Sequence, residues 1–334
     1  MAISELESTS RIEAWEHLSR LPSTLDAMYE WMVMQIPHEW REVSTKLLLW
    51  VTLALRPLSI AELVVALDER RLGLVDHETI RACINRCGQI LRIAVDDTVH
   101  LMHHSAREYL WGRLESSPSF FKDCVELNPF NLREGHKLIA SLCIRNLKDA
   151  TQPRIRDLRE QKRGTKIMDS TTFSTSTPTA LSGYAKAFWT DHVRNAGELV
   201  LEIADNNAQL FEEHSPIRGI LACEVSKGLL TEDISVLHHA AYYGFAPLVG
   251  RLLKKGWWNK LRRRRLLGER DGLGRTALHL AIHRHDNDPI VELLLDRGAD
   301  VSCEDHTGAT ALDHAIKCGT PEMVSILAAY GQRG

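Results

Sequence analysis

Three histidines and a serine lie close together in the stretch VHLMHHSAREYL, which runs from Val99 to Leu110. Histidine is a common metal ligand and general base, so this spacing raises the question of a metal or catalytic site. On a strand, however, successive side chains point to opposite faces, so His100 and His103 would diverge. No Cys, Asp or Glu stands beside them at the spacing of zinc ligands. We therefore expect neither a catalytic nor a metal site here.

The same stretch has the pattern of a β-hairpin followed by a helix. The runs ILRIAV (Ile90–Val95) and VHLMH (Val99–His103) are rich in alternating apolar residues, and the Asp-Asp-Thr between them is typical of a turn. Ser105 is followed three residues later by Glu108, which is the capping-box pattern for a helix starting near Ala106. The histidines are thus interpreted as part of a strand end that leads into a capped helix.

Composition sets the class of protein. The chain has 334 residues, 44% of them hydrophobic and 25% charged, which is ordinary for a globular protein of two or three domains. Its net charge of −3 gives no general reason to expect binding to nucleic acid. The longest apolar stretch, Leu47–Leu55, is about half as long as a membrane span requires, and no signal peptide is visible. Seven scattered cysteines indicate reduced thiols. We expect a cytoplasmic or nuclear protein without a membrane or metal partner.

The N-terminal region has the pattern of a compact helical unit. Apolar residues recur at helical spacing at Leu25, Met28, Met32 and Ile36. The next helix, REVSTKLLLWVTLAL, is apolar on most sides and is predicted to be central.

A capping box then opens IAELVVALD, and HETIRACINRCG leads into the hairpin. Helices followed by a two-stranded wing form a winged helix, a fold that often reads DNA through a basic recognition helix. Taking IAELVVALD as that helix, its acidic and apolar character disfavours DNA binding.

The middle of the chain carries less information. Gly135–Asp149 has the pattern of an amphipathic helix. From Thr151 to Ser182 the periodicity is lost and the sequence becomes rich in Ser and Thr, which predicts a mobile linker. Order resumes at YAKAFWTDHVRNA, where the aromatic residues are interpreted as core anchors.

The C-terminal third contains an internal repeat. The lines SVLHHAAYYGFAPLVGRLLKKG, TALHLAIHRHDNDPIVELLLDRG and TALDHAIKCGTPEMVSILAAYG share a leucine at Leu237, Leu278 and Leu312. These leucines are 41 and 34 residues apart, against an ankyrin period of about 33. Thr276-Ala-Leu-His279 stands where the ankyrin family has Thr-Pro-Leu-His, so each line resembles an ankyrin repeat. The expected structural residues are Leu237, His238, Gly244, Thr276, Leu278, His279, Thr310 and Leu312.

The longer spacing marks an insertion, WWNKLRRRRLLGER (Trp257–Arg270), between the first and second repeats. Clustered cations beside two tryptophans suit an acidic or anionic partner, and a nuclear-import signal is another reading. A solvated helix with the tryptophans packed inward is the plain alternative. The candidate partner-binding residues are Trp257, Trp258, Lys260, Arg262, Arg263, Arg264 and Arg265.

The order of parts resembles one family. A winged helix with LALRPLSIAELVVAL and LMHHSAREYL, then YAKAFWTDHV, then ankyrin repeats, is similar to the C-terminal half of fungal NACHT–ankyrin proteins, which are NLR-like signalling ATPases. In that class a histidine in a Met-His-Asp or similar motif, at the end of the winged helix, contacts the phosphate of ADP. Met102-His103 looks like the Met-His part of that motif. The chain has no G-x-x-x-x-G-K-[ST] loop. The resemblance implies that His103 is vestigial or is served by an NTPase on a separate chain.

These observations give one set of expectations. The fold is mainly α, with a winged-helix-like domain (residues 1–115), a helical segment and linker (116–182), a helical region (183–232) and an ankyrin solenoid of about three repeats (233–334). The function is non-enzymatic protein binding through the ankyrin surface, by an NLR-like protein without its own NTPase domain and without a cofactor. Nucleic-acid or chromatin binding through Lys260–Arg265 is the alternative.

Overall fold

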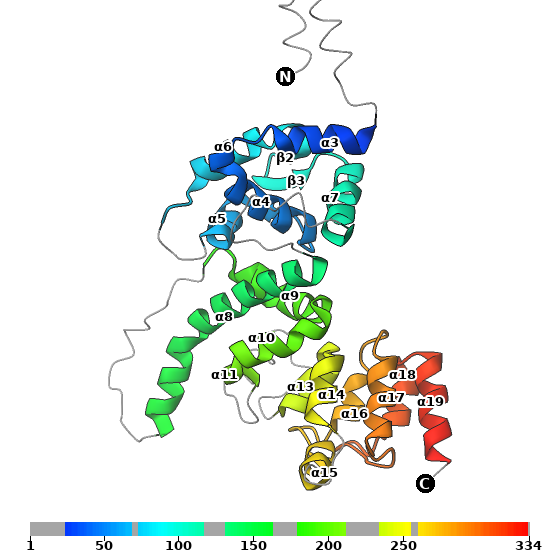
Figure 1. Cartoon of the computed structure of the whole chain (residues 1–334). Coiled ribbons are helices and arrows are strands. Elements are labelled where there is room, and N and C mark those ends of the chain that lie inside the picture. The colour runs from blue at the N-terminus through cyan, green and yellow to red at the C-terminus, as the bar shows by residue number, and fades with distance from the viewer. Residues whose placement is uncertain are drawn as a thin grey trace, which may run out of the picture. The chain divides into compact units, whose positions relative to one another are not determined.

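The computed structural model describes residues 24–68, 73–116, 131–162, 179–211, 234–254 and 260–332. The chain divides into two compact units, Met1–Leu132 and Arg133–Gly334 (Figure 1). The fold is mainly helical with one small sheet, as the sequence predicts. No helix among the described residues combines the length and apolar character needed to cross a membrane.

The first unit is a winged helix. Its sheet is antiparallel in the order β1-β3-β2, with Leu58 opposite Val99 and Leu91 opposite Leu101. The predicted hairpin is therefore present, and β1 adds a third strand that the sequence pattern does not predict. The elements are α3 (Leu25–Met34), α4 (His38–Leu53), β1 (Leu58–Ser59), α5 (Ile60–Leu67), α6 (His77–Arg86), β2 (Leu91–Ile93), β3 (Thr98–Leu101) and α7 (His104–Ser116).

The helix α4 is the core of this unit. Its residues Leu47–Leu53 are all buried, which confirms the predicted central helix. The predicted stripe on α3 is confirmed only in part: Ile36 is buried and Met28 and Met32 are half-buried, but Leu25 is 52% exposed. Tyr29 and Val33, which the stripe leaves out, are buried. The face of α3 is set by Tyr29, whose ring lies 5.4 Å from that of Tyr109 in α7.

The helix before the hairpin occupies the recognition position. In a helix-turn-helix the second helix reads DNA, and that helix is α6, so the assignment of this role to IAELVVALD is wrong. Two arginines of α6 are engaged within the unit: Arg81 pairs with Asp97 at 2.7 Å, and the Arg86 guanidinium lies 4.0 Å from the Trp40 ring centroid. The charge of α6 thus gives no support to DNA binding.

The second unit is a stack of helices. Its elements are α8 (Leu132–Lys162), α9 (Ser182–Asn195), α10 (Val200–Asn206), α11 (Ala208–Phe211), α13 (Val236–Tyr243), α14 (Ala246–Leu252), α15 (Lys260–Gly268), α16 (Ala277–Ala281), α17 (Asp288–Asp296), α18 (Ala311–Cys318) and α19 (Pro321–Gly331). The helix α8 continues past Asp149, so the loss of periodicity after Thr151 does not end it. Residues 163–178 of the predicted linker lie outside the described residues.

The stacking begins before the first recognised repeat. The helix α13 packs on α16 and α14 packs on α17, as neighbouring ankyrin repeats do; α9 packs on α13 and α10 on α14 in the same way (Figure 1). Trp189 of α9 is buried, with its ring stacked 5.6 Å from that of His239. The pair α9–α10 therefore covers an apolar end of the stack that would otherwise meet water.

Candidate partner-binding surface

Each first helix of the three repeats begins at a hydroxyl residue. Ser235 caps α13 by accepting a hydrogen bond from the His238 N–H at 3.4 Å. At α16 the Thr276 hydroxyl lies 2.9 Å from His279 Nδ1, and at α18 the Thr310 hydroxyl accepts from the Asp313 N–H at 3.3 Å. At α13 and α18 the hydroxyl satisfies an N–H group that a helix start leaves without an intrahelical partner. At α16 it is His279 Nδ1 that accepts, from the Thr276 N–H at 3.2 Å.

Two histidines join one repeat to the next. The imidazole of His238 bonds through Nε2 to the carbonyl of Arg275 at 3.0 Å, and that of His279 bonds to the carbonyl of Ala309 at 3.3 Å. Both side chains are fully buried. Asp313 stands at the equivalent position of the third repeat, where it donates no such bond and instead accepts from the Thr310 N–H at 2.8 Å. Asp313 therefore contributes to the cap of α18, but it does not form the bond to a later carbonyl that His238 and His279 form.

Buried aspartates hold the turns that precede α16 and α18. Asp271 accepts from the backbone N–H of Leu273 and of Arg275 through Oδ1, while its Oδ2 accepts from the Arg275 guanidinium at 2.6 and 3.0 Å. Burial would raise the pKa of Asp271, but these hydrogen bonds and the charge of Arg275 outweigh it, so the pKa is lowered.

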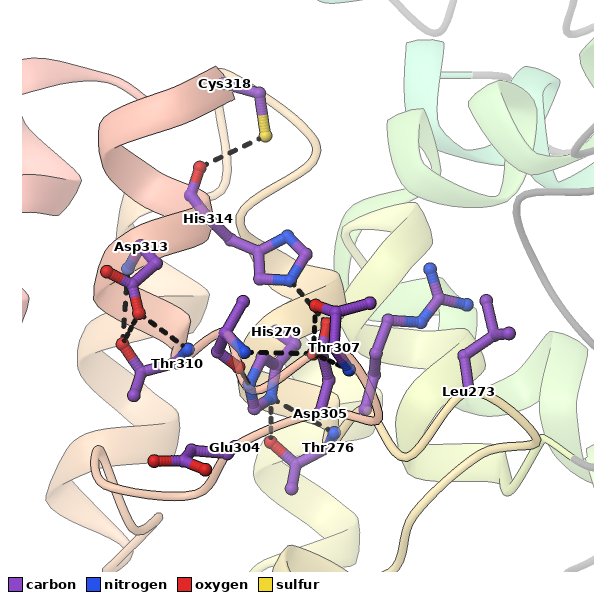
Figure 2. Close-up of polar contacts among 12 residues, drawn as sticks. Leu273, Thr276, His279, Glu304, Asp305, Thr307, Thr310, Asp313, His314 and Cys318 are labelled. Atoms are coloured by element: carbon purple, nitrogen blue, oxygen red, sulfur yellow. Dashed lines mark hydrogen bonds and ion pairs between the residues drawn. The ribbon is translucent and has the colours of Figure 1, made fainter.

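The turn before α18 is built on Asp305. This carboxylate accepts from the N–H and hydroxyl of Thr307 and lies 2.9 Å from Nε2 of His314, as Figure 2 shows. Despite the cost of burial, its pKa is lowered by these bonds. A histidine thus takes the place that Arg275 has one repeat earlier.

Close packing fixes the junction of the first two repeats. Gly244 ends α13 with φ +84, and a Cβ atom there would lie 2.9 Å from Nε of Arg194 and 3.0 Å from Oδ1 of Asn287. The amide of Asn287, 1% exposed, donates to the carbonyls of Ala241 and Ala281. No local sequence pattern indicates this buried role of Asn287.

The anchor leucines of the three repeats differ in burial. Leu237 and Leu278 are buried, and Leu312 is half-buried at the end of the described stack. The stack also exposes apolar side chains: Ile316 of α18 is 67% exposed, and Leu273, at the turn tip between Asp271 and Gly274, is 46% exposed. A firmly held turn that presents an apolar side chain to solvent is suited to contact a partner.

The insertion forms a helix beside the stack. Leu266 and Leu267 of α15 are buried, whereas Lys260, Arg262, Arg264 and Arg265 are exposed and Arg263 is half-buried. The helix lies apart from the row of repeat helices (Figure 1). Trp257 and Trp258 lie outside the described residues. The structure thus brings the five cations together on one short helix and says nothing of their packing against the tryptophans.

His103 lines a cavity of about 470 Å³ in the first unit, together with Arg56, His100, His104 and Arg107. The helix α7 begins at His104, so the predicted start at Ala106 with Ser105 as cap is wrong. His103 takes the capping role: its Nδ1 accepts from the Ser105 N–H at 3.3 Å and lies 2.7 Å from Ser105 Oγ. Among the described residues, no three His, Cys, Asp or Glu side chains are placed to hold a metal ion.

Comparisons with known proteins identify both parts. Residues 29–119 match the winged helix domain of GPI inositol-deacylase, and residues 207–305 and 237–333 match ankyrin repeats. The human protein "Transient receptor potential cation channel subfamily A member 1" is 40% identical over 93 residues, 28% of this chain and 8% of that protein. "BTB/POZ domain-containing protein 1" of Schizosaccharomyces pombe is 36% identical over 75 residues, 22% of this chain and 6% of that protein.

These matches cover less than a tenth of either relative, so they concern the ankyrin type of module and not the whole proteins. The chain thus combines a winged-helix domain of the GPI inositol-deacylase type with ankyrin repeats, and the repeats make it a protein-interaction module.

Proposed function

We propose that the chain is a non-enzymatic regulatory protein whose ankyrin surface binds a protein partner. The observation that carries the proposal is the contrast at the turns: Asp271 and Arg275 are buried and firmly bonded, while Leu273 at the tip between them is exposed. Such a tip is already ordered before binding, so little conformational entropy is lost when a partner covers it.

We further propose that the protein acts in NLR-like signalling and that His103 is the residue of the winged helix that would meet a nucleotide phosphate on a separate NTPase chain. The exposed ring of His103 and the guanidinium of Arg107 line one cavity, which supports an anionic ligand there. The Nδ1 atom is committed to Ser105, so contact with a phosphate would use Nε2. If no NTPase chain binds, the capping role accounts for His103 by itself.

A second candidate function is nucleic-acid or chromatin binding through α15. The exposed cations of this helix favour it. Such binding would weaken steeply with salt, because phosphate contacts release counterions, whereas burial of apolar surface at a protein partner would not.

The proposed binding surface is tested by changing Leu273, the residue at the turn tip. After isolation of a partner by affinity purification, the dissociation constant is measured for the full chain, for Leu273→Glu, and for Leu74→Glu, which changes an equally apolar residue of the first unit that is 73% exposed. We expect Leu273→Glu to weaken binding about tenfold or more, with Leu74→Glu unchanged. Equal binding by both variants would contradict the proposed surface, and ATP turnover by the chain alone would contradict the non-enzymatic function.

A further inference from the structure

The helix α15 has two distinct faces. Successive residues of a helix are rotated by about 100°, so Leu266 and Leu267 lie on one side with the half-buried Arg263 between them. The opposite side is exposed. It carries one apolar side chain and three guanidinium groups: Leu261, Arg262, Arg264 and Arg265. We refer to these four residues as the α15 face.

Leu261 is the unexpected member of this face. It is 81% exposed, more than Leu273 or Ile316, the other large apolar side chains that the described part of the second unit presents to solvent. By helical rotation it lies between Arg264 and Arg265. A solvated cationic helix needs no leucine at this place, whereas a binding surface uses an apolar contact surrounded by polar groups.

The sequence around α15 is strongly basic, whereas the rest of the chain carries a net negative charge. The 17 residues Lys254–Arg270 contain eight of the 41 Lys and Arg residues and a single acidic residue, Glu269. Their net charge is +7, so the remaining residues sum to −10 in a chain of net charge −3. The basic residues around α15 would attract a short anionic ligand. A long polyanion would also be repelled by the net negative charge of the other residues.

We propose that the α15 face binds a short acidic segment of a partner protein that carries an apolar side chain. Leu261 supplies the apolar contact, and the guanidinium groups of Arg262, Arg264 and Arg265 bind carboxylates, for which their planar donor geometry is suited. The inference rests on the proposed function, protein binding by the ankyrin stack, and names the chemistry of the partner.

The helix is held ready for this contact. Leu266 and Leu267 are buried, and just beyond the helix the Arg270 guanidinium donates to the carbonyl of Glu304 at 2.7 Å. A recognition helix that is fixed before binding loses less entropy than a flexible basic tail.

The same features argue against the other anionic partners. Phosphates offer nothing to an exposed leucine, so Leu261 has no role in nucleic-acid backbone binding. A single leucine buries less apolar surface than one acyl chain, which by itself binds a bilayer only marginally.

The experiment measures binding of a fluorescein-labelled peptide of twelve residues, made of Asp and Glu with two central leucines, to the full chain by fluorescence anisotropy. We expect saturable binding, weakened about tenfold or more by Leu261→Ser and lost in the triple variant Arg262→Gln, Arg264→Gln, Arg265→Gln. Leu261→Met should retain most of the affinity. The corresponding triple lysine variant keeps the charge but loses the planar donor geometry, so it should bind more weakly than the unchanged chain and more tightly than the glutamine variant. Lys317→Gln, which removes an exposed charge elsewhere on the stack, is the matched control.

Three outcomes would overturn the inference: no binding of the peptide, binding that Leu261→Ser leaves unchanged, or tighter binding to a 20-base-pair DNA duplex or to vesicles of phosphatidylcholine and phosphatidylserine than to the peptide. The thermal unfolding midpoint should be unchanged in each variant because the replaced side chains are exposed. If a native partner is lost with Leu273→Glu but kept by the α15 variants, the proposed function stands and only this inference fails.

Discussion

The buried ion pair that holds the turn before α16 offers a sharp test of how the ankyrin surface is built. Its side chains are almost inaccessible, with Asp271 0% and Arg275 6% exposed, and two hydrogen bonds of 2.6 and 3.0 Å join them. In Asp271→Asn the amide oxygen can still accept from the backbone, but the guanidinium of Arg275 loses its counter-charge while it stays buried.

Loss of one partner from a buried pair costs about 3–5 kcal/mol, so we expect Asp271→Asn to lower the free energy of unfolding of the repeats by about that amount. Hydrogen exchange at pH 7 in α16 and α17 measures it in the full chain. The double variant Asp271→Asn, Arg275→Gln should recover part of the loss, because no uncompensated charge remains. A loss below about 1 kcal/mol, or a double variant that equals the sum of the single ones, would refute this reasoning.

The same pair gives a dependence on pH. The pKa of Asp271 is lower in the folded state than its ordinary value of 3.8, so the folded state binds a proton less readily than the unfolded chain. The stabilisation is therefore fully present above pH 3.8 and is lost as the pH falls through the folded pKa. Asp271→Asn should remove this part of the acid sensitivity.

Four further predictions follow from the packing and from the motifs. Leu278→Ala should cost roughly 2–4 kcal/mol and lower hydrogen-exchange protection along the repeats; an equal fall in Leu47–Leu53 would contradict the division into independent domains. Gly244→Ala should cost about 1–3 kcal/mol in denaturant unfolding, because φ is +84 and the Arg194 side chain is in the way; an unchanged midpoint would contradict this. Burial lowers the pKa of His136 to about 4 from 6.5, so the free energy of unfolding should fall as the pH drops from 6.5 toward 4, and His136→Gln should flatten that slope; an equal slope in both proteins would show that His136 is not responsible. Calorimetric titration should detect no micromolar ATP binding, since the chain has no phosphate-cradling loop; tight, Mg²⁺-dependent binding would refute this.

Local patterns predict much of this fold. The capping box at Ser59 and Glu62 is present, with the Glu62 N–H 3.2 Å from Ser59 Oγ, because both partners belong to one helical turn. The ankyrin repeats are found because the leucines, hydroxyl caps and turn residues recur at a fixed spacing. Such signals depend on residues close in sequence, where the geometry of a helix or turn is already fixed.

What the patterns miss depends on distant contacts. The strand β1 has two residues and exists only because β3 pairs with it. The face of α3 follows from Tyr29 packing on Tyr109, and the role of Asn287 from two carbonyls, one of them 46 residues away. At the start of α7 the sequence pattern predicts Ser105 as the cap. The imidazole of His103 is the cap instead, because its Nδ1 accepts from the Ser105 N–H.

The central claim is that the ankyrin turns bind a protein, and site-specific photo-crosslinking tests it most directly. A photoreactive amino acid replaces Leu273 at the exposed turn tip or, as the control, the exposed Leu74 of the winged-helix unit. Each variant is expressed in cells that naturally contain the chain. We expect position 273 to form a discrete protein adduct, which an excess of the purified unlabelled chain suppresses and which position 74 does not form. Adducts of equal yield from both positions, or from neither, would contradict it.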